Sequence, residues 1–148
     1  MRHAVKFAAA AVVTVVAGGV AFAQADVIKQ RKETMKAVGG SLGTLVKMVK
    51  GEEAYDSAKA KTAVETIAAK AKGFDAMFPA GSEKGGETEA AATIWSDTAG
   101  FKAALAKLET TAAAQVAVAS KDLDGTKAAV GALGGACKGC HDTYRVKK

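Results

Sequence analysis

The feature that most constrains this chain is an apolar repeat in which the gaps between residues alternate between three and four. The repeat occupies residues 28–49, 60–78, 94–119 and 123–144. This spacing places apolar side chains on one face of an α-helix, and that face must pack against another element to leave water. No stretch of useful length alternates apolar and polar residues as a strand would. The sequence therefore predicts an all-α fold with four helices.

Residues that break helices separate these four stretches. Gly51 follows the first stretch, and residues 79–86, which are rich in glycine and contain the only proline, lie between the second and the third. Residues 122–125 separate the last two stretches, and Asp122 or Asp124 is a candidate N-cap of the final helix. Because most of these connections are short, we expect neighbouring helices to run antiparallel, in an up-down-up-down four-helix bundle.

The composition agrees with one helical domain. The chain has 148 residues, of which 49% are hydrophobic and 24% charged, while one proline and 5% aromatic residues fit poorly with a β-sandwich. Glycines inside the predicted helices each cost ~1 kcal/mol relative to alanine. We interpret them either as sites of close backbone approach or as loose packing. They are Gly39, Gly40, Gly43, Gly131, Gly134 and Gly135.

The N-terminus has the layout of a secretory signal peptide. Three basic side chains lie within the first six residues, an uncharged run covers residues 7–20, and Ala21 and Ala23 form a small-x-small cleavage pattern. This apolar run is shorter than the ~20 residues that a spanning helix needs. We therefore expect cleavage of the signal peptide over residues 1–23, which leaves a mature bundle domain over residues 24–148 with no membrane attachment, outside the cytosol.

The charge of the mature chain gives little support to nucleic-acid binding. The formal net charge is +6, and it falls to +4 when Arg2 and Lys6 leave with the signal peptide. The remaining basic residues form no block along the sequence, whereas a nucleic-acid interface gathers them on one face.

One motif carries chemistry. Cys137, Lys138, Gly139, Cys140 and His141 form C-x-x-C-H, the attachment signature of c-type haem. On a helix the two thiols and the imidazole stand at positions i, i+3 and i+4 and share one face. The thiols can then add to the two vinyl groups of one porphyrin, while the imidazole reaches the iron. The motif predicts one covalent haem c with His141 as an iron ligand.

Three other interpretations of the motif are weaker. A thioredoxin-like redox pair normally opens a helix after a strand, and no strand pattern precedes Cys137. A zinc site needs four ligands, but the mature chain has no further cysteine, and its only other histidine, His3, lies in the signal peptide. A simple disulfide between Cys137 and Cys140 leaves His141 unexplained.

The chain resembles cytochrome c′ and the other class II cytochromes c over essentially its whole mature length. The resemblance rests on residues 135–145 near the C-terminus, Arg31 and Met35 in the first helix, residues 78–81, and the Ile94–Trp95 pair. Class I cytochromes c carry C-x-x-C-H near the N-terminus instead. The resemblance implies a periplasmic location, one haem c whose iron is bound by His141, and either a homodimer through the first two helices or a monomer.

The sixth iron ligand is left open by this pattern. The mature chain lacks a second histidine, and of Met35, Met48 and Met77 only Met35 lies on an expected core face, since the other two fall one position off. In low-spin proteins similar to this one, a methionine at the position of Met35 binds the iron, whereas in high-spin ones the residue there covers it. We favour His141 and Met35 as axial ligands.

The favoured function is single-electron transfer between periplasmic redox partner proteins. The alternative is a high-spin, five-coordinate cytochrome c′ that binds NO or CO. We do not expect an enzyme, because no other nucleophile, base or metal cluster stands out in the sequence.

Two arginines are further candidates for cofactor binding. Arg31 precedes Met35 by four residues, and a cation on an apolar face is costly unless it is paired. The resemblance assigns it to the haem propionates, and a snorkelling surface arginine is the alternative. Arg145 follows His141 by four residues. The resemblance places it near the proximal face of the haem, and the alternative is charge complementation of the helix C-terminus.

Two aromatic residues are interpreted as structural. Tyr144 continues the apolar face of the last helix, so we expect it in the core. Trp95 is expected to anchor the long loop to the bundle rather than to relay electrons.

We predict that Cys137→Ser or Cys140→Ser yields a poorly folded protein, because a bundle rich in alanine and glycine would enclose a void without its haem. Such voids cost core stability in kilocalories per mole. Thermal unfolding of the double variant, followed by circular dichroism, tests this. A sharp transition at the wild-type temperature would contradict it.

Overall fold

The computed structural model describes the backbone of residues 18–147 and the side chains of residues 25–147. Most of the predicted signal peptide, residues 1–23, lies outside the described residues, so its cleavage stays a prediction. Among the described residues, no helix combines the length and the apolarity needed to cross a membrane.

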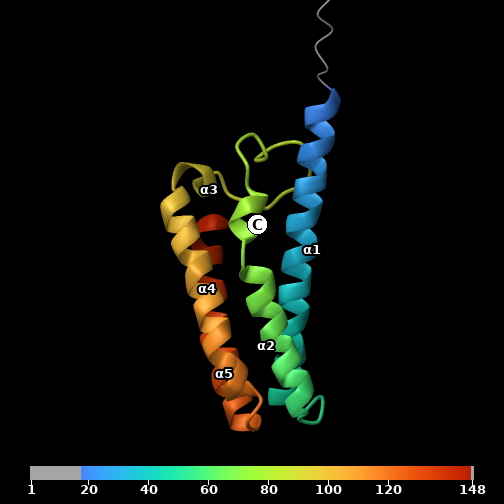
Figure 1. Ribbon diagram of the computed structural model, residues 1–148, viewed down its shortest axis with the longest axis vertical. Helices are drawn as coiled ribbons and strands as arrows, with labels where there is room; N and C mark the ends of the chain where they lie inside the picture. Colours follow the sequence, from blue (N-terminus) through green and yellow to red (C-terminus); the bar gives the residue numbers. More distant parts are fainter. Residues whose placement is uncertain (1–17, 148) are drawn as a thin grey trace, which may run out of the picture.

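Four long helices form the bundle within the described residues. They are α1 (Gly18–Val49), α2 (Ser57–Ala71), α4 (Thr98–Ala119) and α5 (Leu123–Tyr144), with the short elements η1 (Phe74–Met77) and α3 (Thr93–Ser96) between α2 and α4. Successive long helices run in opposite directions, and each packs against two neighbours, in the cyclic order α1, α2, α4, α5 (Figure 1). The predicted all-α, up-down-up-down four-helix bundle is confirmed.

Aspartate side chains start three of the long helices. Asp56, Asp97 and Asp122 accept hydrogen bonds from the amides of Lys59 (2.9 Å), Gly100 (3.0 Å) and Gly125 (2.7 Å) respectively. An N-cap of this kind satisfies a backbone donor that has no partner within the helix. Asp122 is therefore the cap of α5, and Asp124 lies in its first turn.

The apolar repeat overestimates the length of two helices. The stretch 60–78 was expected to be one helix, but Gly73 adopts a left-handed φ of 69° and ends it. The stretch 94–119 breaks at Asp97, whose carboxylate caps α4. Periodicity misses both breaks because Phe74 and Ile94 continue the apolar spacing and are buried, both in the smaller core cluster.

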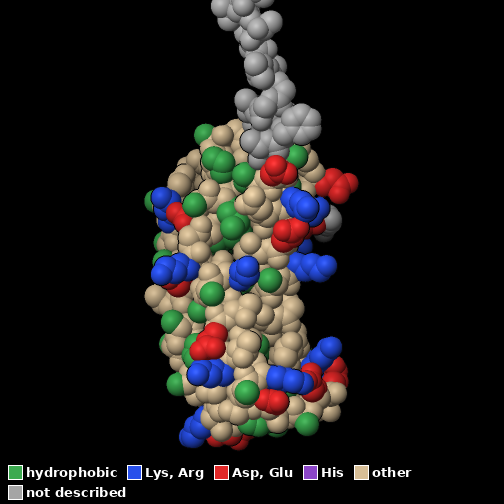
Figure 2. All heavy atoms as spheres, turned by 45° about the vertical axis from the view of Figure 1, so that its right-hand side comes forward, with side chains coloured by type: hydrophobic (Ala, Val, Ile, Leu, Met, Phe, Trp, Pro, Cys, Tyr) green, Lys and Arg blue, Asp and Glu red, His purple; other side chains and the backbone are tan. Residues whose placement is uncertain are grey.

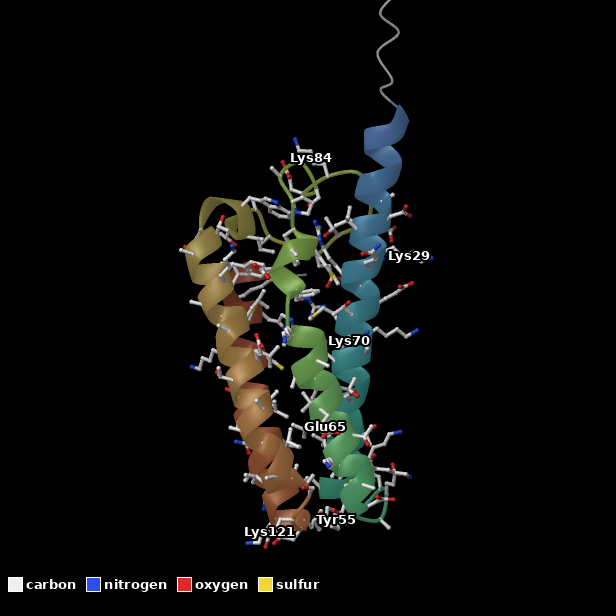
Figure 3. All side chains as sticks on the ribbon, in the orientation of Figure 1. Lys29, Tyr55, Glu65, Lys70, Lys84 and Lys121 are labelled. Carbon is white, nitrogen blue, oxygen red and sulfur yellow. The ribbon has the colours of Figure 1, made fainter. Side chains whose placement is uncertain are left out.

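The core consists of two clusters along the bundle axis. The larger one fills the half near the α4–α5 turn, and the smaller one, with Phe74, Ile94, Phe101, Leu105 and Tyr144, lies at the opposite half. Figure 3 labels Tyr55 and Lys121 at the first end and Lys84 at the second.

One predicted core position in α1 is wrong. Met48 is 1% exposed, whereas Val49 is only partly buried. Met48 stands three residues after the fully buried Leu45, and both side chains belong to the larger core cluster.

The charged side chains on one face of the bundle are dispersed. Figure 2 shows acidic and basic side chains interspersed on the face of the bundle that it presents. This distribution agrees with the absence of a basic block in the sequence.

No atom of the described chain outside the local helix would lie within 4 Å of a Cβ added at the helix-interior glycines named above. Within this chain, close backbone approach therefore does not explain them. Gly125 differs, because a Cβ there would collide with the carbonyl oxygen of Val118.

Two variants of α5 test this difference. We predict that Gly125→Ala destabilises the protein by about 1–3 kcal/mol, because the new methyl group must displace backbone. Gly131→Ala meets open space and should stabilise the helix by up to ~1 kcal/mol. Chemical denaturation of the two holoproteins measures both effects, and equal destabilisation by the two variants would refute the prediction.

Candidate functional site

A cavity of about 770 Å³ opens at the half of the bundle that holds the smaller core cluster. Its size lies within the ~300–1,000 Å³ typical of ligand sites. Residues from α1, η1, α4, α5 and the loop before α3 line it. Its apolar wall includes Met35, Val38, Phe74, Phe78, Phe101 and Leu105.

The last two turns of α5 bring the C-x-x-C-H motif to this cavity. Cys137, Cys140 and His141 all line it, and both cysteines are free and half-buried. Burial raises the pKa of both thiols, and for Cys140 the nearby Cys137 adds to this effect. Two thiols and an imidazole thus line one cavity together with apolar side chains, which fits a planar apolar group bound by two thioethers and one nitrogen.

The surroundings of His141 favour the neutral imidazole. Burial contributes most to lowering its pKa, and the positive charge of Arg145 lowers it further, while Asp142 opposes both. A neutral imidazole keeps a nitrogen lone pair available for a metal ion.

Met35 is the only methionine of the described residues that lines the cavity. Its half-buried side chain packs against both core clusters. Met48 is buried in the larger cluster, and the sulfur of Met77 accepts a hydrogen bond from Thr34 Oγ1 at 3.8 Å. Among the described methionines, Met35 is therefore the candidate thioether ligand. Met48, which the apolar repeat places off the core face, is a core residue.

Arg31 is buried rather than snorkelling, so that alternative is wrong. The residue is 5% exposed, and burial lowers its pKa. Its guanidinium donates to Met77 O (2.6 Å), Ser82 O (2.9 Å) and Ser82 Oγ, and it stacks 4.3 Å from the centre of the Phe78 ring. Arg31 therefore holds the loop after η1 against α1. It also lines the cavity, and its pairing with haem propionates stays a prediction.

Trp95 anchors the same loop, as predicted. Its indole Nε1 donates to Pro79 O at 3.1 Å, and its ring lies 6.0 Å from that of Phe78 in an edge-to-face contact. Neighbouring aromatic rings in this geometry add to the stability that their burial provides.

Tyr144 is a core residue, as expected, with a polar partner that the sequence did not reveal. It is 8% exposed, and its hydroxyl donates to Asp97 Oδ2 at 2.7 Å. This hydrogen bond lowers the pKa of Asp97 and raises the pKa of Tyr144 to about 12. Asp97 thus ties the start of α4 to the end of α5 beside the cavity.

Arg145 pairs with Glu89, a residue that sequence reasoning missed. Arg145 Nε and Nη2 donate to Glu89 Oε2 at 2.8 and 2.5 Å, and both residues line the cavity. An isolated antiparallel bridge joins Ala90 to Arg145. Nothing in the local sequence marks Glu89, because its partner lies 56 residues away.

Comparison with known proteins agrees with this site. The family model described as cytochrome C′ matches residues 26–145. Cytochrome c-556 of Agrobacterium fabrum is 45% identical over 121 residues, which cover 82% of each chain. Cytochrome c′ of Rhodopseudomonas palustris is 41% identical over 144 residues, or 97% of each chain.

Solved structures of such proteins share the fold. The structure of cytochrome c′ from Rhodopseudomonas palustris covers 83% of this chain and 98% of its own, with a TM-score of 0.79. A nitric oxide complex of a mutant of cytochrome c prime from Alcaligenes xylosoxidans is 33% identical, covers 84% of this chain and 97% of its own, and has a TM-score of 0.74.

The chain belongs to the cytochrome c′ family. It is a monohaem c-type cytochrome, and it carries covalently bound haem c with its iron.

The Tyr144–Asp97 hydrogen bond gives a prediction for stability against pH. Tyr144→Phe should lower the melting temperature at pH 7. The difference from wild type should shrink as pH falls below ~4, because the stabilisation from an Asp pKa lowered by folding disappears when that carboxylate is protonated. It should shrink again above pH ~10, where the unfolded tyrosine ionises before the folded one.

Thermal melts of the two holoproteins between acidic and alkaline pH measure this difference. A difference that stays constant across the whole range would show that the hydrogen bond has no part in it.

Proposed function

We propose that this cytochrome holds a five-coordinate, high-spin haem whose open axial position binds a small neutral ligand such as NO or CO. The observation that carries the proposal is the apolar character of the cavity wall opposite α5. Met35 packs there against both core clusters, and Phe74, Phe101 and Leu105 stand beside it. The nitric oxide complex of the Alcaligenes relative supports the same assignment.

His141 would hold the haem iron, which would supply the position where a small ligand binds. The cavity wall determines which ligands can enter. An apolar wall offers no hydrogen bond to water or to an anion, so their entry costs desolvation free energy. A neutral diatomic ligand loses little solvation free energy when it enters. Packing of Met35 on two sides favours a role as a cover over the open position.

A second candidate function rests on the same residue. Met35 is the one thioether on the wall, and binding of its sulfur to the iron would complete a His/Met pair. Such a pair raises the potential and suits single-electron transfer. The similarity to cytochrome c-556 is compatible with this candidate.

The biological setting is proposed on the same grounds. The signal peptide predicted over residues 1–23 sends the chain to the periplasm, where residues 24–148 would exchange electrons with redox partner proteins. A homodimer through α1 and α2 is one arrangement that the family suggests. We expect ligand binding and electron exchange rather than turnover of a substrate.

The absorption spectrum distinguishes the two functions. For the five-coordinate haem we predict a high-spin ferric spectrum without the weak charge-transfer band of a methionine-bound iron, and binding of CO by the ferrous form. Met35→Leu conserves volume, so it should cost less than ~1.5 kcal/mol and leave the spectrum unchanged. Protein matured in a cytochrome-assembling host is the sample.

Met48→Leu provides the matched control, since Met48 is buried away from the cavity. A low-spin spectrum that becomes high-spin in Met35→Leu but not in Met48→Leu would replace the first function by the second.

A further inference from the structure

Backbone hydrogen bonds join residues 89–91, in the loop before α3, to residues 144–146 at the end of α5. These backbone contacts form a clip between the two segments. Val146 N donates to Glu89 O at 2.8 Å, and Ala91 N donates to Tyr144 O at 3.0 Å. These two bonds flank the bridge between Ala90 and Arg145. The clip thereby brings loop residues that line the cavity beside the turn of α5 that carries His141.

The Glu89–Arg145 ion pair adds charge to this clip. Both nitrogen contacts of Arg145 fall on one oxygen, Glu89 Oε2, so the guanidinium has a defined position. The side chains remain 35% and 53% exposed for Glu89 and Arg145. Such an exposed pair contributes little to stability. The ion pair therefore affects the position of the positive charge more than the free energy of unfolding.

Arg145 lies close to the predicted iron ligand. It follows His141 by one helical turn, and both residues line the cavity. A positive charge close to a haem iron favours the reduced state, because the reduced iron carries one positive charge less.

We propose that Glu89 is a positioning residue, whose carboxylate holds the Arg145 guanidinium on the His141 side of the cavity and so sets the positive field at the haem iron. The inference rests on covalent attachment of haem at α5. It does not depend on whether the iron has five or six ligands, so it stands or falls separately from the proposed function.

Redox titration of holoprotein variants tests the proposal. Arg145→Gln should lower the reduction potential. Glu89→Gln should raise it in the Arg145→Gln background, where only a negative charge is lost. In the wild-type background, the effect of Glu89→Gln on the reduction potential should be smaller or of opposite sign, because this variant also releases Arg145. Equal effects in the two backgrounds would overturn the proposal, since fixed charges act additively.

Glu87→Gln is the matched control. Glu87 also lines the cavity and loses the same charge, but it takes no part in the clip. We expect its effect on the potential to be the same in both backgrounds. If Glu87→Gln shows the same dependence on Arg145 as Glu89→Gln does, the role assigned to Glu89 is wrong.

Glu89→Asp distinguishes the effect of side-chain length from the effect of charge. It keeps the carboxylate but shortens the side chain, so release of Arg145 should lower the potential, whereas a purely electrostatic role for Glu89 predicts no change. Hydrogen exchange at Arg145 Nε, followed by NMR of the reduced protein, should accelerate roughly twofold to fivefold in Glu89→Gln, the range that an exposed ion pair is worth. Unchanged exchange would likewise overturn the proposal.

Discussion

The architecture depends on one constraint: α5 places its C-x-x-C-H motif at an apolar cavity that the protein side chains leave open. A bundle rich in alanine and glycine leaves a cavity between α1, α4 and α5, and its volume is of the size that ligands occupy. Cys137, Cys140 and His141 line this volume from α5, and aromatic and aliphatic side chains stand across from them. Because a covalently held porphyrin would fill this cavity, we expect cofactor attachment and folding to be coupled.

Polar contacts around the cavity determine how its rim is held, and they differ in physical character. Arg31 is buried, and its guanidinium donates to the loop after η1. One carboxylate oxygen of Asp97 accepts a hydrogen bond from the Tyr144 hydroxyl, and the other oxygen caps α4. One carboxylate thus joins two helices. Glu89 and Arg145 form an exposed pair beside His141. The buried contact holds the loop in place, whereas the exposed pair is suited to adjusting charge near the iron.

Much of this could be predicted from local patterns. Amphipathic periodicity identified the four long helices, aspartate capping identified the start of α5, and the spacing of Cys137, Cys140 and His141 placed them on one helical face. Prediction failed where packing overrides periodicity. Phe74 and Ile94 continue the apolar repeat although the backbone breaks at Gly73 and Asp97. Met48 is buried in the larger core cluster where the apolar repeat predicts Val49.

The amino-acid sequence by itself determined the helical class and the number of long helices, and it predicted the residues that attach the haem, because each of these follows from spacing within a few turns of one helix. Only the tertiary structure decided which groups surround the cofactor. Glu89 and Arg145 lie 56 residues apart, Tyr144 and Asp97 lie 47 apart, and Arg31 and Ser82 lie 51 apart. Such pairs form because the bundle brings the helix ends and the loop before α3 to one end of the molecule, and no local signal specifies a partner at that separation.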